Sequence, residues 1–279
     1  MHIIMAGDRR VLSGIEVVLY STMLHNTNVH WHLFSMDIDV RNDEAGVGYK
    51  YTGLTKEDEK WLRHIVKYLD FNSELTLHDV HNIYENTVGD SVNKYTNFTP
   101  YASLRLLADL VLPKDVQQTW YLDADLLIQD DISDIYYKLL RNRDYNYAAY
   151  SVPDANSNAG EMISGVLIMN LEKARREGWL QRARFNYNRN LYRYPDQKAL
   201  EDAAEFYVLE ETYGYLQDHR QATYKPKILH FTNVNAKIYD SNVGIEKFYK
   251  YWPEHKYIKE GIDIARELYD IDKLIPTTK

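Results

Sequence analysis

WYLDADLLI, residues 120–128, is an apolar stretch interrupted by two carboxylates, Asp123 and Asp125. The flanking Trp, Tyr, Leu and Ile residues predict a largely buried strand. Because side chains alternate along a strand, the two aspartates are expected on one side, where each could give an oxygen to a divalent cation. The alternative is a solvated pair that opens a turn into Gln129-Asp130-Asp131. Charges beside a buried strand need a partner, which favours a metal site serving a phosphorylated substrate.

Composition narrows the class of protein. The 279 residues, 45% of them hydrophobic, suit one large soluble domain or a domain with an appendage. A formal charge of -8, a pI near 5.7 and no local basic face predict that nucleic acid is not a partner. The absence of cysteine removes disulfides, zinc–thiolate sites and thiol nucleophiles. We find neither a secretory signal nor an apolar run of about 20 residues, so we expect a cytoplasmic protein.

Strand and helix patterns alternate along the chain. Apolar runs predict strands at 2–6, 29–36, 74–80, 120–128, 147–152, 165–170 and 227–231. Helical patterns cover 11–23, 55–69, 99–110, 131–140, 171–186 and 261–269, and a glycine-containing loop is expected between Asp37 and Thr55. This order predicts an α/β fold with a mainly parallel sheet, which binds ligands at the carboxyl ends of its strands. Asp8, Asp37 and Asp125 are expected there.

Four motifs extend this pattern towards a known family. They are YLDADLLIQDDI at 121–132, SGVLIMNL at 164–171, PDQKAL at 195–200 and HFTNVNAK at 230–237. In their order and approximate spacing the chain resembles retaining glycosyltransferases of family 8, over roughly residues 1–240. The resemblance implies a GT-A fold, with a Rossmann-like, mainly parallel central sheet flanked by helices and a short C-terminal tail. It divides the chain into a nucleotide-sugar-binding catalytic domain, 1–240, and a helical and aromatic tail, 241–279.

The resemblance implies a manganese site, with magnesium as the other possible ion. Asp123, Asp125 and His230 match the family residues that hold the ion against the diphosphate of a UDP-sugar, and oxygen and imidazole ligands suit such an ion. Lys237 matches a lysine that contacts the diphosphate, and Arg105 an arginine that orients an aspartate and the sugar. Without the other motifs, His230 would be interpreted as a core histidine whose hydrogen bonds are satisfied, and Lys237 as a solvated lysine.

The remaining matches concern the donor. Ala6 ends the first strand and Asp8 and Arg10 follow it, where the family binds the nucleotide, and Ser164 lies where the family binds the donor sugar. Asp196 and Gln197 match the catalytic pair, with the aspartate near the sugar hydroxyls and the glutamine beneath the anomeric carbon.

An amide such as Gln197 is a poor nucleophile, so the expected route to retention is same-face substitution through an oxocarbenium-like state, with a diphosphate oxygen as base. The alternative for Asp196 is a purely structural role as a helix N-cap.

The implied activity is transfer of glucose or galactose from UDP-glucose or UDP-galactose to an acceptor. The acceptor would be a glycan, a glycolipid or a glycoprotein, and acceptor contacts in such folds come from variable loops. Aromatic and basic residues at 248–252 are compatible with peripheral contact at the inner membrane face, although nearby acidic residues oppose it.

Three departures from the family pattern leave other functions open. Ile163 stands where the family has a polar residue, Asn233 replaces a glycine, and Lys198 replaces the second aspartate of Asp-Gln-Asp. One alternative is therefore a catalytically silent paralogue that binds nucleotide sugar or glycan. Another is a haloacid-dehalogenase-like phosphatase, whose Asp-x-Asp also ends a strand, but that motif normally opens its domain.

Overall fold

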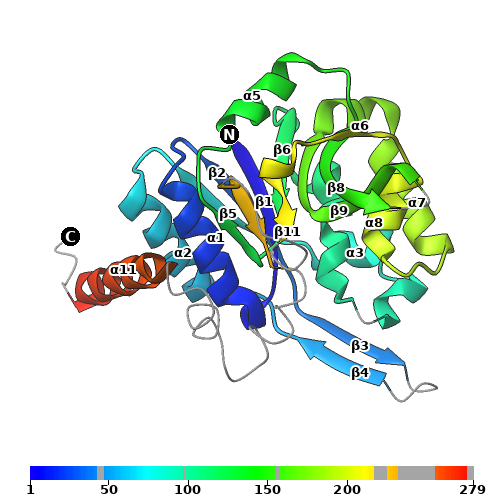
Figure 1. The fold of residues 1–279 in the computed structure, drawn as a ribbon. Coiled ribbons are helices and arrows are strands. Elements are labelled where there is room, and N and C mark those ends of the chain that lie inside the picture. Colours follow the sequence, from blue (N-terminus) through cyan, green and yellow to red (C-terminus); the bar gives the residue numbers. More distant parts are fainter. Residues whose placement is uncertain (43–46, 97, 155–156, 217–224, 232–254, 275–279) are drawn as a thin grey trace.

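The computed structural model describes residues 1–42, 47–96, 98–154, 157–216, 225–231 and 255–274 (Figure 1). Its main sheet has seven strands in the order β10-β8-β9-β6-β1-β2-β5. Their bounds are Phe206–Val208, Tyr147–Asp154, Ser157–Asn170, Gln118–Leu122, His2–Ala6, His30–Ser35 and Glu74–Asp79, in that order. All neighbouring pairs are parallel except those that β9 forms with β6 and with β8. The predicted mainly parallel α/β sheet is confirmed.

Alternating side chains of the central strands feed two cores, one on each face of the sheet. Ile3 and Met5 of β1 belong to one buried cluster, whereas Ile4 and Ala6 belong to the other. The first cluster includes helices α1 (Leu12–Met23), α2 (Lys56–Leu69), α5 (Ser133–Arg141) and α11 (Lys256–Leu274). The second includes α3 (His81–Thr87), η3 (Pro100–Leu107), α4 (Ala108–Val111), α6 (Leu171–Glu177), α7 (Trp179–Arg189) and α8 (Pro195–Glu201).

Local sequence fixes several helix ends. Thr55 and Asp58 form a capping box at the start of α2, in which each side chain bonds to the other residue's backbone N–H. Gly178, at a φ of 71°, interrupts the single helix expected over 171–186 and separates α6 from α7. The helix expected over 99–110 is mostly 3-10, as η3, and becomes α-helical only at Ala108. A short 3-10 turn, η1 (Arg9–Val11), precedes α1.

The expectation of one continuous strand through the acidic pair is wrong. Strand β6 ends at Leu122, Asp123–Asp125 form a turn, and the chain resumes as β7 (Leu126–Ile128) in another sheet. This small sheet has the order β11-β12-β7, where β11 is Tyr215–Leu216 and β12 is Ile228–His230. The two aspartates therefore converge through a turn rather than through strand alternation.

The loop expected between Asp37 and Thr55 is instead an antiparallel hairpin. Strands β3 (Ile38–Asn42) and β4 (Val47–Tyr51) pair from Ile38↔Tyr51 to Asn42↔Val47. The hairpin projects from the end of the sheet opposite to that at which β1 begins (Figure 1). It therefore lies at the carboxyl ends of the parallel strands.

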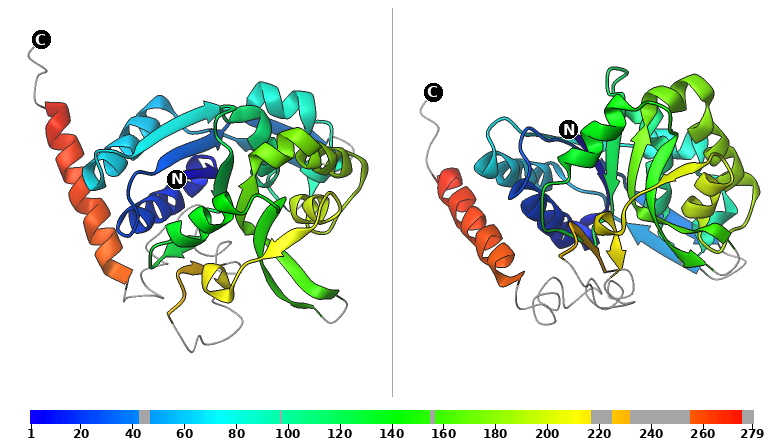
Figure 2. Two further views of the ribbon diagram at one scale, coloured as in Figure 1. Left: turned by 90° about the horizontal axis from the view of Figure 1, so that it is seen from above. Right: turned by 45° about the horizontal axis from the view of Figure 1, so that its top comes forward.

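Helix α11 is longer than the predicted 261–269 and lies beside α1 and α2 in both views of Figure 2. Ile258 and Ala265 are fully buried in the core that those helices share. The expected boundary at residue 240 and the aromatic stretch at 248–252 lie outside the described residues. Among the residues that the structure describes, no helix is long and apolar enough to span a bilayer.

Candidate active site

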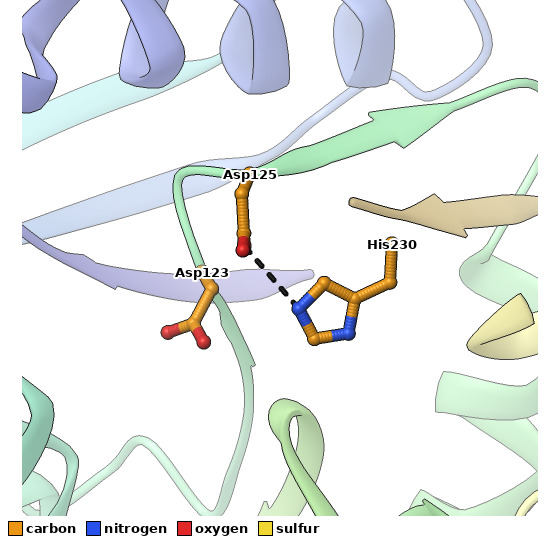
Figure 3. A group of neighbouring side chains, drawn as sticks. All are labelled: Asp123, Asp125 and His230. Carbon is orange, nitrogen blue, oxygen red and sulfur yellow. Dashed lines mark ion pairs between the residues drawn. The ribbon is translucent and has the colours of Figure 1, made fainter. Parts of the chain in front are cut away.

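Three side chains from separate elements converge at the carboxyl end of β6. Asp123 follows β6, Asp125 lies in the turn before β7, and His230 ends β12 (Figure 3). One potential ligand atom from each lies within 4.8 Å of the other two, and His230 Nε2 is 3.3 Å from Asp125 Oδ1. Pairing of β12 with β7 sets this arrangement, since it places His230 opposite Leu126, and Phe231 N donates to Asp125 O at 3.0 Å. The structure thus brings together the three predicted metal ligands.

Gly165 provides the space in which these groups meet. Its carbonyl accepts a hydrogen bond from Asp123 N at 2.9 Å, so β9 holds the acidic turn in place. A Cβ on Gly165 would lie 2.4 Å from His230 Cε1 and 2.7 Å from Asp123 Oδ2. Only glycine allows the backbone to approach the two side chains this closely.

The donor set and its electrostatics fit a divalent cation. Two carboxylates and one imidazole suit Mn²⁺ and, less specifically, Mg²⁺. Burial raises the pKa of Asp123, against the opposing effect of Arg105, and the charge of Asp125 raises it further. Burial alone would lower the pKa of His230, but the charges of Asp125 and then Asp123 outweigh it and raise that pKa. Two acidic groups held this closely around a buried imidazole call for compensating positive charge.

Arg105 connects the acidic turn to the start of α8. Its Nη2 donates to Asp123 Oδ1 at 2.9 Å, and its Nε is 3.2 Å from Asp196 Oδ2. Nη1 donates to the Ser164 carbonyl, and the guanidinium lies over the Tyr121 ring, 4.1 Å from its centroid. Burial would lower the pKa of Arg105, but Asp123 and Asp196 raise it above its ordinary value, so the group stays charged.

The two candidate catalytic residues lie at the start of α8. Tyr194 is the N-cap and Pro195 the first helical residue, so Asp196 is not a cap, and that alternative is wrong. The Asp196 side chain is almost fully buried against Arg105. Gln197 is half-buried, and its Nε2 lies 3.4 Å from Glu161 Oε1, a weak contact.

Ala6 is the last residue of β1, and Asp8 and Arg10 follow it. Ala6 is buried, and Asp8 is 2% exposed. Asp8 accepts from Arg10 N at 2.9 Å and from Arg10 Nε at 2.7 Å, so it caps η1 and fixes the arginine side chain. Lys237 and Asn233 lie outside the described residues.

Sequence reasoning missed two contributors to this site. The first is Gly165, which stood in a recognised motif but whose missing side chain was not connected with His230. The second is Tyr121, whose ring lies beneath the Arg105 guanidinium. The glycine between a polar residue and an apolar strand was the available signal for a close backbone approach. No comparable signal in the sequence indicated that the Tyr121 ring stacks on Arg105.

Comparisons with known proteins define the fold. No protein-family model matches the chain. A search of curated protein sequences likewise finds no match. Solved structures do match: the galactosyltransferase LgtC with donor and acceptor sugar analogues has a TM-score of 0.59 at 14% identity, over 83% of this chain and 87% of that one. Mouse xyloside xylosyltransferase 1 has a TM-score of 0.57 at 16% identity, over 82% and 96%.

The glycosyltransferase GlyE of Streptococcus pneumoniae TIGR4 has a TM-score of 0.57 at 18% identity, over 82% of this chain but 54% of its own. The topology described above and these neighbours agree. The chain has the Rossmann-like GT-A fold of glycosyltransferases, as predicted.

Proposed function

We propose that this protein is a retaining hexosyltransferase of family 8 that moves glucose or galactose from a UDP-sugar to a glycan, glycolipid or glycoprotein acceptor. The observation that carries the proposal is the convergence of Asp123, Asp125 and His230 at the carboxyl end of β6, within a GT-A fold. Ligands of open α/β sheets bind at that end. The ion we propose is Mn²⁺, with Mg²⁺ as the alternative.

The proposed roles of the described residues use the place of each group, and the role of Lys237, which lies outside the described residues, rests on the resemblance alone. A divalent cation held by the three ligands would offset the negative charge that builds on UDP as the glycosyl–phosphate bond breaks. Arg105 keeps Asp123 and Asp196 in place through contacts of 2.9 and 3.2 Å. Lys237 is proposed as a further cation for the diphosphate.

The sugar is proposed to lie between the metal ligands and the start of α8. Asp196 is held there by Arg105, which also fixes the Ser164 backbone next to Gly165. We assign Asp196 to the sugar hydroxyls and Gln197 to the face beneath the anomeric carbon. Retention then proceeds by same-face substitution, in which the acceptor hydroxyl gives its proton to a diphosphate oxygen.

The test is UDP release in the presence of Mn²⁺, with UDP-glucose and UDP-galactose supplied separately. Wild-type protein should release UDP from one donor and form a product with the α-anomeric configuration of that donor. D125N should lose at least 100-fold of this activity, whereas D130N, a change at an exposed aspartate beyond β7, should keep it. Consumption of neither donor, with or without acceptor sugars, rejects the enzymatic proposal.

A silent nucleotide-sugar-binding paralogue is the second candidate. Ile163, half-buried and paired with Tyr150 in the β8–β9 ladder, supplies no polar side chain where the family pattern has one. Tight Mn²⁺-dependent UDP binding without turnover of either donor would favour this candidate. The phosphatase alternative finds no support in a GT-A fold, and release of phosphate inhibited by vanadate would be needed to restore it.

We further propose that the protein acts in the cytoplasm, where UDP-sugars are available, with peripheral contact at the inner membrane face as a possible route to glycolipid acceptors. Sedimentation with vesicles that contain anionic lipid would test that contact. Recovery of all protein in the supernatant at low ionic strength would reject it.

A further inference from the structure

The β3–β4 hairpin is joined to the end of β1, where the nucleotide is proposed to bind. Asp8 and Gly53 form an isolated antiparallel bridge, and Arg9 N donates to Thr52 O at 3.1 Å. Ser35 Oγ donates to Gly7 O at 2.8 Å and accepts from Leu54 N at 2.8 Å. These bonds hold the base of the hairpin against the loop that follows β1.

Through this junction the hairpin supplies an aromatic support for Arg10. The Arg10 guanidinium lies 4.2 Å from the centroid of the Tyr51 ring, close enough for cation–π stacking. Tyr51 is 7% exposed, and the Tyr101 ring packs against it with centroids 6.0 Å apart. The Tyr101 hydroxyl donates to Met36 O, so the stack rests on a fixed base.

Arg10 is held in one orientation yet keeps an accessible face. Its Nε pairs with Asp8 Oδ2 at 2.7 Å, and that carboxylate is 2% exposed. The Arg10 side chain remains 51% exposed. Since a buried carboxylate already balances its charge, Arg10 offers a ligand a flat surface more than a net attraction for phosphate.

The position of this stack suits the base of a nucleotide whose phosphates reach the metal ligands. Tyr101 and Arg105 are four residues apart on η3, which corresponds to about 8 Å along a 3-10 helix. Arg105 contacts Asp123, and Tyr101 contacts Tyr51. Helix η3 therefore carries both the residue that supports the stack and the residue that holds Asp123, and a nucleoside diphosphate is longer than the rise between those two residues. Planar guanidinium groups are common stacking partners for nucleobases.

We propose that Arg10, backed by Tyr51 of the β3–β4 hairpin, is the surface on which the base of the donor nucleotide stacks. Asp8 then acts as a positioning residue that fixes Arg10, rather than as a direct contact to the base. This inference rests on the proposed function and adds an element, the hairpin, that the motifs did not include.

The test compares UDP with inorganic pyrophosphate, both with Mn²⁺, by titration calorimetry. R10K keeps the positive charge but loses the planar guanidinium group, and Y51L removes the aromatic ring that supports it. Stacking is worth about 1–3 kcal/mol per base, so both variants should bind UDP about 5- to 150-fold more weakly. Pyrophosphate affinity should stay within about twofold, because the phosphates lie at the metal.

Matched controls separate stacking from a general effect. Arg9 is equally exposed, at 55%, and pairs with Asp58 on α2 instead of stacking. R9K and Y51F should therefore bind UDP as the wild type does, and melting temperatures show whether Y51L remains folded. Unchanged UDP binding by R10K overturns the inference, as does a parallel loss of pyrophosphate binding. Wild-type protein that binds neither probe overturns the proposed function itself, together with this inference.

Discussion

The backbone of Gly165 lies so close to the His230 ring that a Cβ there would come within 2.4 Å of Cε1. The G165A substitution should therefore push His230 or Asp123 out of position. We expect Mn²⁺ affinity to fall at least tenfold, the size of effect seen when groups that orient metal ligands are lost, and activity to fall with it. Calorimetric titration with Mn²⁺ measures the change.

Gly48 provides the matched control, since nothing lies within 4 Å of a Cβ built there. G48A should bind Mn²⁺ as the wild type does. Equal Mn²⁺ affinity in G165A and the wild type would show that the three ligands do not act together.

Arg105 should matter both for stability and for ligand binding. R105M leaves the Asp123 and Asp196 carboxylates without their buried partner. Breaking a buried ion pair from one side typically costs about 3–5 kcal/mol, which we expect as a lower free energy of unfolding in urea. Binding of UDP with Mn²⁺ should also weaken by more than tenfold, because Asp123 loses its orientation.

The buried pair of Arg184 with Asp109, 2.6 Å apart, is the comparison, because α7 and α4 hold it within the second core. R184M should lose a similar free energy of unfolding and keep the UDP affinity of the wild type. A similar loss of UDP affinity in both variants would mean that Arg105 acts only through general stability.

A row of three histidines crosses β1, β2 and β5. His2 Nδ1 is 3.1 Å from His32 Nε2, and His32 Nδ1 is 3.1 Å from His78 Nε2. Burial lowers all three pKa values, to about 4 for His2 and about 3 for His32, and neighbouring histidines contribute to both of these shifts. The row is therefore neutral in the folded protein at neutral pH.

Because the folded pKa values lie below the unfolded value of 6.5, the unfolded chain binds more protons in acid. The stability that the row contributes is fully present above pH 6.5 and is lost as the pH falls towards 4 and 3. For His32 the slope is at most about 1.4 kcal/mol per pH unit. Urea unfolding of H32Q at pH 7.0, 5.5 and 4.5 should show a flatter dependence than the wild type.

Helix α11 is anchored by Arg266. Its guanidinium lies 3.5 Å from the Trp61 ring centroid and donates to Glu16 Oε1 at 2.7 Å. R266A should cost about 1–3 kcal/mol of unfolding free energy, because the buried Glu16 carboxylate loses a charged donor. K259A, which affects an exposed pair with Asp263, should change stability by less than about 0.5 kcal/mol. Equal effects of the two variants would argue against an anchoring role.

Much of the sheet could be predicted because β1 is a short apolar run that leads into a helical pattern, and because β2 and β5 carry apolar residues at alternate positions. The same signals failed around the acidic pair. Nothing in WYLDADLLI indicates that Leu122 and Leu126 belong to different sheets, because both sides are equally apolar and the switch depends on pairing with β12, about a hundred residues later. Periodicity reports burial, not the identity of the partner strand.

The β3–β4 hairpin was missed although the sequence contains a signal for it. Ile38 and Val40 alternate with polar residues, and Tyr49 and Tyr51 do the same after a segment rich in Asn, Asp and Gly, so a hairpin signal was present. The proposed metal ligands, in contrast, were found through motif order. Their closeness depends on Gly165 and on strand pairing, which a single sequence does not reveal.

The turn at Asp123–Asp125 is the point where the chain passes from the seven-stranded sheet to the small sheet, and His230 returns from the small sheet to meet it. An ion bound there would link the seven-stranded sheet to the small sheet, which are hydrogen-bonded separately. Its loading would then be linked to the docking of β7, β11 and β12, so that saturation protects the amides of those strands from hydrogen exchange. In such a protein, metal occupancy and the integrity of the small sheet would be two measures of the same equilibrium.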